Sequence, residues 1–440
     1  MSRAICIRNG VIVTMNPQRE IIEGGTVIVE DDRIAGVHRD KNWKGRGGDE
    51  AIDASGKVVI PGLINSHMHS RPFRALGDDL TGAMWAKRYA VGLSKVMDEE
   101  GEYLGGLNAF TECLKGGVTC ACNMPPFVEG CDRAAWEIGI RAILFPHGGD
   151  DPTLTEANES LEKSVENVAR AGDQRQKRVK IWFGFGHPKE CSPEYFKKLR
   201  TCATQYGVGI QGHVAMSQRE AQADVEKWGR PVIEYFSETG FLGPDVVIDH
   251  GVWLTPQEIR LLAKNGTPLI HSPRMNMRYG NGVTPVPEML KEGVCVALGT
   301  DGPLSTYRID MFEAMRLACF LQRVHKRDVS ALSAMQALEM VTLGGAKAVG
   351  LEREIGSLEA GKKADIALID FRQPHLTPYV TGRHGNLITL LVFSCSAADV
   401  DTVLVDGKIV VRDRKLLTVN EGEMIARVNE YANRALAQID

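Results

Sequence analysis

The sequence of 440 residues contains no apolar stretch that approaches the ~20 residues of a membrane-spanning helix. Its opening residues, Met1 to Cys6, lack the hydrophobic region of a signal peptide. An excess of charge of one sign is also missing, because 52 basic and 56 acidic residues leave a net charge of −4. We therefore expect a cytoplasmic protein with no membrane partner and no nucleic-acid partner.

The ten cysteines show no disulfide or metal-binding pattern. Cys120-x-Cys122 lacks a second such pair, and several cysteines lie inside apolar runs, where a free thiol behaves as a small hydrophobic side chain. We expect Cys120 and Cys122 to be structural positions on one strand, and free thiols suit a reducing cytoplasm. The sequence also contains no short-period repeat and no low-complexity segment.

Short strand-like segments occupy both ends of the chain. Residues 1–58 and 360–420 contain alternating apolar stretches, of which Gly25–Val29 is an example. Neither piece alone buries a two-sided core, so we expect the two ends to meet as one small β-sandwich. Residues 421–440 follow as a polar C-terminal helix. A chain of this length exceeds the usual size of a single domain, which agrees with one large and one small domain.

Residues 59–359 alternate apolar strands with amphipathic helices. The helical pattern from Glu99 to Lys115, for example, precedes an apolar run that starts at Val118. About 300 residues of such units are typical of a (β/α)8 barrel, whose chemistry lies at the C-terminal ends of its strands. The predicted fold class is therefore α/β, a (β/α)8 TIM barrel with a small β-sandwich domain.

Polar residues close several of these strand patterns. His67 and His69 follow the first apolar run of the barrel segment, and His213, His250 and Asp301 each follow a later one. Successive side chains on a strand point to opposite faces, so His67 and His69 can reach one ion only where the strand ends and its backbone bends. Imidazole is a common ligand for first-row metals. The pattern indicates a metal site at the C-terminal mouth of the barrel.

Five motifs, in this order along the chain, resemble those of the amidohydrolase superfamily. The resemblance is strongest to the branch that holds the triazine chlorohydrolases, melamine deaminase, and the adenosylhomocysteine, guanine and cytosine deaminases. It spans nearly the whole chain and includes the closing segment Gly356–Ile366. The motifs are Pro61–His69, Gly212–Ala215, Asp249–Val252, His271–Pro273 and Gly299–Gly302.

The resemblance implies a metal site that binds one divalent ion. Nitrogen and oxygen ligands with a completing water suit zinc, iron, cobalt or manganese, and zinc is expected on availability. Binuclear relatives carry a carboxylated lysine at the end of the fourth strand, whereas Lys180 lies at the start of that strand here, which favours a mononuclear site. The implied ligands are His67, His69, His213 and Asp301.

The implied catalytic residues are Asp301 and His250. A bound metal brings the pKa of its water close to neutrality, so Asp301 beside it would take the proton and leave a metal-bound hydroxide as the nucleophile. By resemblance, His250 would orient the water or polarise the reacting group of the substrate.

The sequence departs from this branch at one position. Deaminases and dechlorinases of the branch have a glutamate three residues after the third histidine, where it moves a proton to the ring nitrogen and then to the leaving group. This sequence has Met216 there, and methionine has no proton to give. We do not expect Glu220 to substitute, because it would lie roughly two turns away along a helix. Other candidates for the proton donor are His187, Glu190 and His271.

Losing this glutamate leaves the hydrolysis of a carbonyl comparatively intact. We therefore expect an amidohydrolase that cleaves the amide, urea, carbamate or thiocarbamate C–N bond of a small molecule. The alternative is a deaminase or dechlorinase of a triazine, pyrimidine, purine or pterin type of N-heterocycle. A non-catalytic metal-binding scaffold is a third hypothesis.

The expected pocket combines apolar surface with positive charge, and Arg71 and Phe73 are candidates for its wall. Relatives in this branch are commonly dimers or larger, so a homodimer or larger homo-oligomer is expected. The predicted substrate-binding residues are Arg74, Trp85, His187, Met216, His271 and Asn281.

Overall fold

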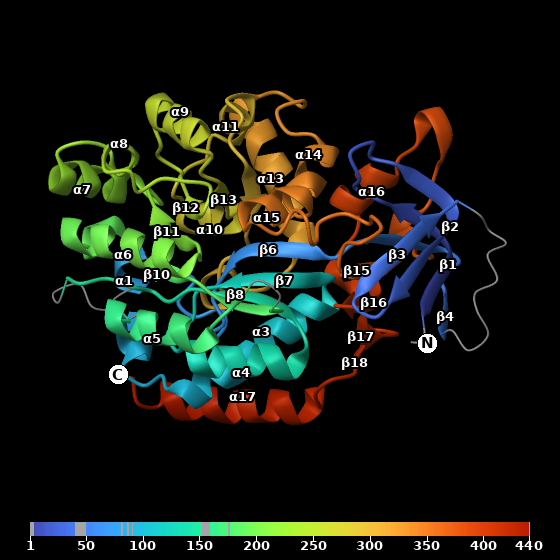
Figure 1. Ribbon diagram of the computed structural model, residues 1–440, viewed down its shortest axis with the longest axis horizontal. Coiled ribbons are helices and arrows are strands. Elements are labelled where there is room, and N and C mark those ends of the chain that lie inside the picture. The colour runs from blue at the N-terminus through green and yellow to red at the C-terminus, as the bar shows by residue number, and fades with distance from the viewer. Residues whose placement is uncertain are drawn as a thin grey trace.

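The computed structural model describes residues 4–39, 50–80, 82–85, 88–89, 91–151, 159–174 and 177–439. Figure 1 shows a sheet built from both ends of the chain on one side, and parallel strands with their helices on the other. The expected α/β class with parallel strands is confirmed.

One nine-stranded sheet contains strands from both ends of the chain. Its two halves join where β5 runs antiparallel to β15, with Pro61 opposite Ile366 and Lys57 opposite Asp370. Alternating positions on these strands fill a separate apolar core, which includes Ile12, Val59 and Leu368. The strands are β1 (Ile5–Val13), β2 (Ile21–Glu30), β3 (Arg33–His38), β4 (Glu50–Asp53), β5 (Lys57–Pro61), β15 (Ile366–Asp370), β16 (Val400–Val405), β17 (Lys408–Arg412) and β18 (Lys415–Leu416).

Two further sheets, of four and five strands, contain only parallel pairs. Most of their residues are buried, as expected for parallel strands covered on both faces. The four-stranded sheet comprises β6 (Leu63–Met68), β7 (Val118–Asn123), β8 (Arg141–Leu144) and β9 (Val179–Ile181). The five-stranded sheet comprises β10 (Phe183–Phe185), β11 (Ile210–Val214), β12 (Val246–His250), β13 (Leu269–His271) and β14 (Val296–Leu298).

The helices lie mostly between these strands in sequence and begin at residues suited to capping. Asp98 accepts a hydrogen bond from the Gly101 N–H at the start of α3, and Thr255 and Glu258 form a capping box at the start of α9. The α-helices are α1 (Gly82–Trp85), α2 (Val91–Ser94), α3 (Glu99–Lys115), α4 (Val128–Ile138), α5 (Leu161–Ala171), α6 (Pro193–Tyr206), α7 (Gln218–Trp228), α8 (Val232–Glu238), α9 (Pro256–Asn265), α10 (Pro273–Tyr279), α11 (Val286–Lys291), α12 (Pro303–Thr306), α13 (Met311–Lys326), α14 (Ala334–Met340), α15 (Leu343–Ala348), α16 (Leu387–Phe393) and α17 (Glu421–Leu436). The 3-10 helices are η2 (Pro188–Glu190), η3 (Pro374–Leu376), η4 (Gly382–His384) and η5 (Ala397–Asp399).

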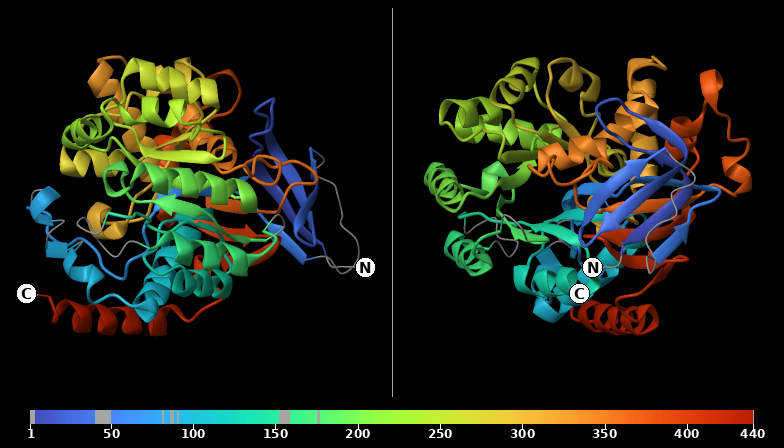
Figure 2. Two further views of the ribbon diagram at one scale, coloured as in Figure 1. Left: turned by 60° about the vertical axis from the view of Figure 1, so that its left-hand side comes forward. Right: turned by 45° about the vertical axis from the view of Figure 1, so that its right-hand side comes forward.

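The last helix, α17, packs along α3 at the lower edge of the view in Figure 1 and lies along the same edge in Figure 2. Lys115 at the end of α3 forms an ion pair with Glu421 at 2.6 Å, and the Tyr431 hydroxyl donates to the Asp98 carboxylate at 2.9 Å. The C-terminal helix expected from Glu421 onward is therefore present, and it covers a helix of the parallel-strand region.

All ten cysteines are free thiols, and Cys120 and Cys122 are buried in β7, as expected for structural positions on one strand. In the part of the chain that the structure describes, no helix combines the length and the apolar character needed to cross a membrane.

Candidate active site

The five polar residues that close the strand patterns meet at one place. His67 lies in β6, His213 and His250 lie in β11 and β12, and His69 and Asp301 follow β6 and β14. The His67 ring centroid lies 5.0 Å from those of His69 and His213 and 5.4 Å from that of His250. Two groups of possible ligand atoms lie within 4.8 Å of one another. One group comes from His67, His69 and His213, and the other comes from His67, His250 and Asp301. The predicted set is therefore brought together.

Backbone carbonyls fix the orientation of two of these histidines. His69 Nδ1 donates to the Met124 carbonyl at 3.1 Å, and His213 Nδ1 donates to the Gly186 carbonyl at 3.0 Å. These hydrogen bonds leave the Nε2 atoms of both rings as ligand atoms. Burial lowers the pKa of both imidazoles well below the ordinary value, so both are neutral, as metal ligation requires.

The buried carboxylate of Asp249 positions His67. His67 Nδ1 lies 3.1 Å from Asp249 Oδ2, and both side chains are fully buried. Asp249 Oδ1 in turn accepts a hydrogen bond from Gln211 Nε2 at 2.8 Å. Sequence reasoning did not assign Asp249 a role, although it directly precedes His250 in a quoted motif. The contact between a carboxylate and a histidine is a common support for a metal ligand.

Asp301 follows the end of β14 and lies beside the histidines. Its carboxylate oxygens lie 3.7 Å from His69 Nε2 and 4.0 Å from His250 Nε2. Asp301 and His250 both have left-handed backbones, with φ of 60° and 73°, which is uncommon for non-glycine residues and is found at functional sites. Burial raises the pKa of the Asp301 carboxyl, so its charged form depends on a nearby cation.

The donor set fits a divalent metal ion. Three imidazoles and one carboxylate converge in a buried position, and His67 Nε2 has no hydrogen-bond partner among the described residues. Nitrogen and oxygen donors of this kind suit zinc, which binds three protein ligands or more together with water in catalytic sites. Glycine keeps the strand ends close, since a Cβ at Gly302 would lie 2.8 Å from His69 Cβ. Lys180 is directed elsewhere, because its ammonium donates to the Gln174 carbonyl.

A second charged pair adjoins the metal-ligand cluster. The His187 ring stacks on that of His213 at 4.9 Å, and His187 Nδ1 is hydrogen-bonded to the Glu220 carboxylate. Burial by itself lowers the pKa of His187, but the charge and the hydrogen bond of Glu220, together with the charge of Glu190, raise it to about 9. Burial raises the pKa of Glu220, but the charge and the hydrogen bond of His187, with the charge of Lys189 and the Met216 N–H, lower it to about 2. His187 is therefore protonated at neutral pH.

The structure revises our expectation for Glu220. Its other carboxylate oxygen accepts the Met216 backbone N–H at 2.8 Å, so Glu220 lies close to the position where the resembling branch has a glutamate. Helix α7 begins only at Gln218, and Glu220 is in its first turn rather than two turns along a helix from His213. The Met216 side chain is half-buried.

The other predicted substrate-binding residues lie in different surroundings. His271 is fully buried, and burial lowers its pKa to about 3, so its ring is neutral at physiological pH. Arg74 is engaged in an ion pair with Glu112. The Trp85 ring lies edge-on to that of Tyr279, and the Asn281 backbone N–H donates to the Asn276 carbonyl. Of the six residues, His187 stacks on His213, and Met216 is linked to His187 through the Glu220 carboxylate.

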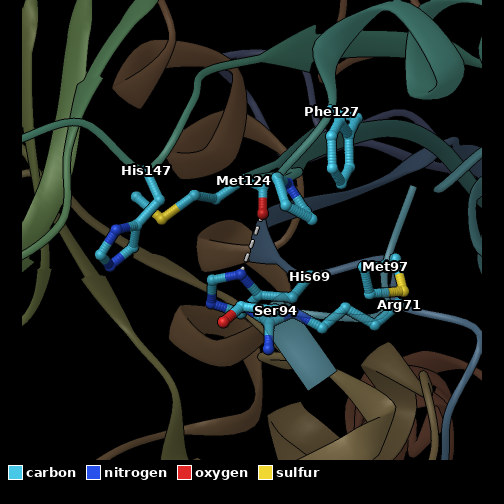
Figure 3. Close-up of a pocket in the computed structure, with 8 residues that line it drawn as sticks. His69, Arg71, Ser94, Met97, Met124, Phe127 and His147 are labelled. Carbon is cyan, nitrogen blue, oxygen red and sulfur yellow. Dashed lines mark hydrogen bonds between the residues drawn. The ribbon is translucent and has the colours of Figure 1, made fainter. Parts of the chain in front are cut away.

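A pocket opens beside His69 (Figure 3). Sequence reasoning named Arg71 for its wall but missed His147, which forms a second histidine group with His187 and His213. The signal was present, because His147 follows the apolar run that includes β8, as the other site residues follow theirs. The lining residues are His69, Arg71, Ser94, Met97, Met124, Pro126, Phe127 and His147.

Comparison with models of known protein families shows which family the chain belongs to. Residues 58–410 match the model of the amidohydrolase family. The chain belongs to the amidohydrolase family. The resemblance seen in the sequence motifs is thereby confirmed. The prediction that the chain is an enzyme acting on C–N bonds other than peptide bonds is confirmed as well.

This amidohydrolase aligns with named relatives over nearly its full length. The 5'-deoxyadenosine deaminase of Methanosarcina mazei is 35% identical over 441 residues, which cover 99% of each chain. The 5-methylthioadenosine/S-adenosylhomocysteine deaminase of Thermococcus onnurineus is 36% identical over 425 residues, which cover 94% of this chain and 95% of the relative.

Solved structures share the fold of this amidohydrolase. An adenosine deaminase from Xanthomonas campestris with bound zinc superposes with a TM-score of 0.93, at 24% identity and 99% coverage of both chains. A zinc complex of atrazine chlorohydrolase from Arthrobacter aurescens superposes with a TM-score of 0.87, at 21% identity, covering 97% of this chain and 99% of the other.

Proposed function

We propose that this amidohydrolase is a metal-dependent deaminase of a small, amino-substituted N-heterocycle. The observation that carries the proposal is the His187–Glu220 pair, a proton donor beside the buried cluster of His67, His69, His213 and Asp301. The full-length relatives that are named deaminases support the same reaction.

One divalent ion, zinc, would be held by His67, His69, His213 and Asp301. When bound, the ion lowers the pKa of a water molecule toward neutrality and so supplies a nucleophile at physiological pH. The zinc-containing structures with the same fold support this choice of metal. Asp249 and two backbone carbonyls hold the imidazoles in the orientation that ligation needs.

Asp301 and His250 act on the attacking water and the substrate. The Asp301 carboxylate accepts a proton from the water, and its distance of 4.0 Å from His250 Nε2 lets both groups act on one reacting carbon. His250 Nε2 then hydrogen-bonds the oxygen that is added to the ring. Both side chains are almost fully buried, which strengthens their electrostatic effect on the transition state.

His187 supplies the proton that the ring nitrogen needs. Its Nδ1 is paired with Glu220, which leaves the Nε2 side of the imidazolium for the substrate. A glutamate at position 216 would have this role in the resembling branch, and here the charge of Glu220 keeps a proton on a neighbouring imidazole instead. Asp301 returns its proton to the leaving amino group and then accepts the proton of the added hydroxyl, so ammonia departs and the ring carbon keeps the oxygen as a carbonyl. Asp301 releases that proton to solvent, and His187 recovers one from solvent.

The second candidate function is hydrolysis of the C–N bond of an amide, urea, carbamate or thiocarbamate. Met216 favours this reaction, because a carbonyl substrate has no ring nitrogen that must be protonated. The sequence alone placed this reaction first. Contact between Glu220 and His187 reverses the order, since it removes the reason for excluding a proton donor.

Product analysis by mass spectrometry separates the two reactions. Zinc-loaded protein is incubated with amino-substituted purines, pyrimidines and triazines, and in parallel with aryl ureas, carbamates and anilides. The proposal predicts replacement of an amino group by an oxygen function, with release of ammonia. Cleavage of the carbonyl substrates into an amine and an acid, with no change to the heterocycles, would contradict the deaminase proposal and support the second candidate.

For the fold, we propose that the two parallel sheets form one (β/α)8 barrel from residues 59–359. Trp182 alone separates β9 from β10, and the Asp301 N–H donates to the His67 carbonyl at 3.1 Å, which links the ends of β14 and β6. The terminal segments 1–58 and 360–420 would form a β-sandwich domain. A cytoplasmic location and a homo-oligomer stay predictions.

A further inference from the structure

Arg71 lines the pocket beside His69 and has no counter-ion among the described residues. It follows His69 by two residues and extends toward His69 and Ser94 in Figure 3. Among the residues that the structure describes, no side chain forms an ion pair or a hydrogen bond with its guanidinium. Arg74 and Arg274, by contrast, are paired with Glu112 and Glu313.

The lining of the pocket leaves the Arg71 charge without compensation. None of the lining residues carries a carboxylate, and Met97, Met124 and Phe127 provide apolar surface. Glu102 is a carboxyl group close enough to Arg71 for their charges to interact, and it is fully buried. Burial raises the pKa of Glu102 to about 8, so it is largely neutral at pH 7 and hydrogen-bonds to Ser70.

A half-buried guanidinium beside apolar side chains is unfavourable until an anion meets it. A guanidinium also matches a carboxylate geometrically, because two parallel N–H groups donate to its two oxygens. Arg71 and His69 line the same pocket, so the cation lies near the proposed metal ligands. An anionic group paired with Arg71 would therefore belong to a molecule that also reaches the metal-ligand cluster.

We propose that Arg71 binds a carboxylate of the substrate, so that the substrate class is a small carboxylated ring compound whose ring packs against Met124 and Phe127. This inference rests on the proposed function, since it assigns a substrate class to the same site. It makes Arg71 a specificity-determining residue.

The test compares two probes of nearly equal shape, 4-aminopyrimidine-5-carboxylate and 4-aminopyrimidine-5-carboxamide. Their binding to zinc-loaded protein is measured by calorimetry for the natural chain, R71M, R71K and R71Q. The carboxylate is expected to bind about tenfold to a hundredfold more tightly than the carboxamide, as a charge-assisted pair predicts. R71M and R71Q should lose this preference, and R71K should keep part of it.

A matched control removes an equal charge elsewhere. Arg383 in η4 is exposed and lies outside the pocket lining, so R383M should keep the full preference for the carboxylate. Equal binding of the two probes by the natural chain, or no binding of either, would overturn the inference. A preference that survives in both R71M and R71Q would also overturn it, because the carboxylate would then be bound by another group such as the metal.

Turnover, measured separately, keeps the two proposals apart. A preference for the carboxylate that depends on Arg71, without ammonia release from any heterocycle, would refute the deaminase proposal and leave the role of Arg71 standing. Ammonia release with equal kcat/KM for the two probes, in both the natural chain and R71M, would support the deaminase proposal and refute the role of Arg71. R71K and R71Q keep the test decisive if R71M does not fold.

Discussion

His67 Nδ1 lies 3.1 Å from Asp249 Oδ2, and neither side chain is exposed to solvent. Replacing Asp249 by asparagine keeps the shape and removes the charge that holds the imidazole. Loss of such a supporting partner typically lowers metal affinity about tenfold to a hundredfold, which is the expected result for D249N. Competition with a chromogenic zinc chelator measures the change.

Asp245 offers the control for this prediction. It precedes β12, the strand that ends at His250, and is paired with Arg200. D245N should bind zinc as tightly as the natural chain. Equal zinc affinities of D249N and D245N would show that the buried carboxylate does not support the ligand.

The pair of His187 and Glu220 is expected to govern turnover rather than metal content. H187Q removes the proton donor and should lower kcat by about 10²–10⁴, the usual range for general acid catalysis. E220Q should lower kcat less, because the imidazole stays while its charged partner is lost. Metal analysis should find the same zinc content in both variants, and an unchanged kcat in H187Q would remove His187 from the mechanism.

Position 216 tests whether a carboxylate restores the arrangement of the resembling branch. M216E places a carboxyl group where deaminases of that branch have one, and ammonia release from amino-substituted heterocycles should rise about tenfold or more. M216Q has nearly the same shape without an ionisable group and is the control. An equal rise in M216E and M216Q would mean that polarity or size, and not proton transfer, limits the reaction at this position.

Glu102 predicts a pH-dependent stability. Burial raises its pKa in the folded chain to about 8, above the ordinary value, so its contribution to stability is full below about pH 4.5 and is lost as the pH rises through 8. E102Q has no such titration. The free energy of unfolding of E102Q, relative to that of the natural chain, should therefore increase as the pH rises from 5 to 8, by at most about 1.4 kcal/mol per pH unit.

Urea unfolding at several pH values measures this difference. Glu99 lies on the same helix, α3, and is exposed, so E99Q is the matched control and should follow the natural chain. Parallel stability curves for E102Q and the natural chain would show that Glu102 is already ionised in the fold at pH 7.

Local signals in the sequence were sufficient for several features. The helix expected from Glu99 to Lys115 has those bounds in α3, because Asp98 caps its start and Gly116 ends it. The convergence of His67, His69, His213 and Asp301 was also predictable, since each residue lies at or shortly after the end of a buried strand. Parallel strands bring such ends to one edge, which makes positions far apart in sequence neighbours in space.

Glu220 shows where sequence spacing is insufficient. The prediction counted residues along one helix from His213, but Ala215 has a left-handed backbone with φ of 51° and α7 begins later, at Gln218. Helical side chains also point toward the N-terminus, so Glu220 in the first turn reaches back to His187. A single turn between strand and helix thus decides whether Glu220 reaches His187, and no pattern of apolar residues encodes that turn.

The pairing of β5 with β15 affects synthesis of the chain on the ribosome. β5 ends at Pro61 and β15 begins at Ile366, so about 300 residues must be translated before the partner strand exists. At ~5–20 residues per second this delay is roughly 15–60 s. During that time one edge of β5 has open N–H and C=O groups, which are a template for pairing with other nascent chains. The yield of folded protein should therefore depend on the chaperones that shield this strand while the rest of the chain is made.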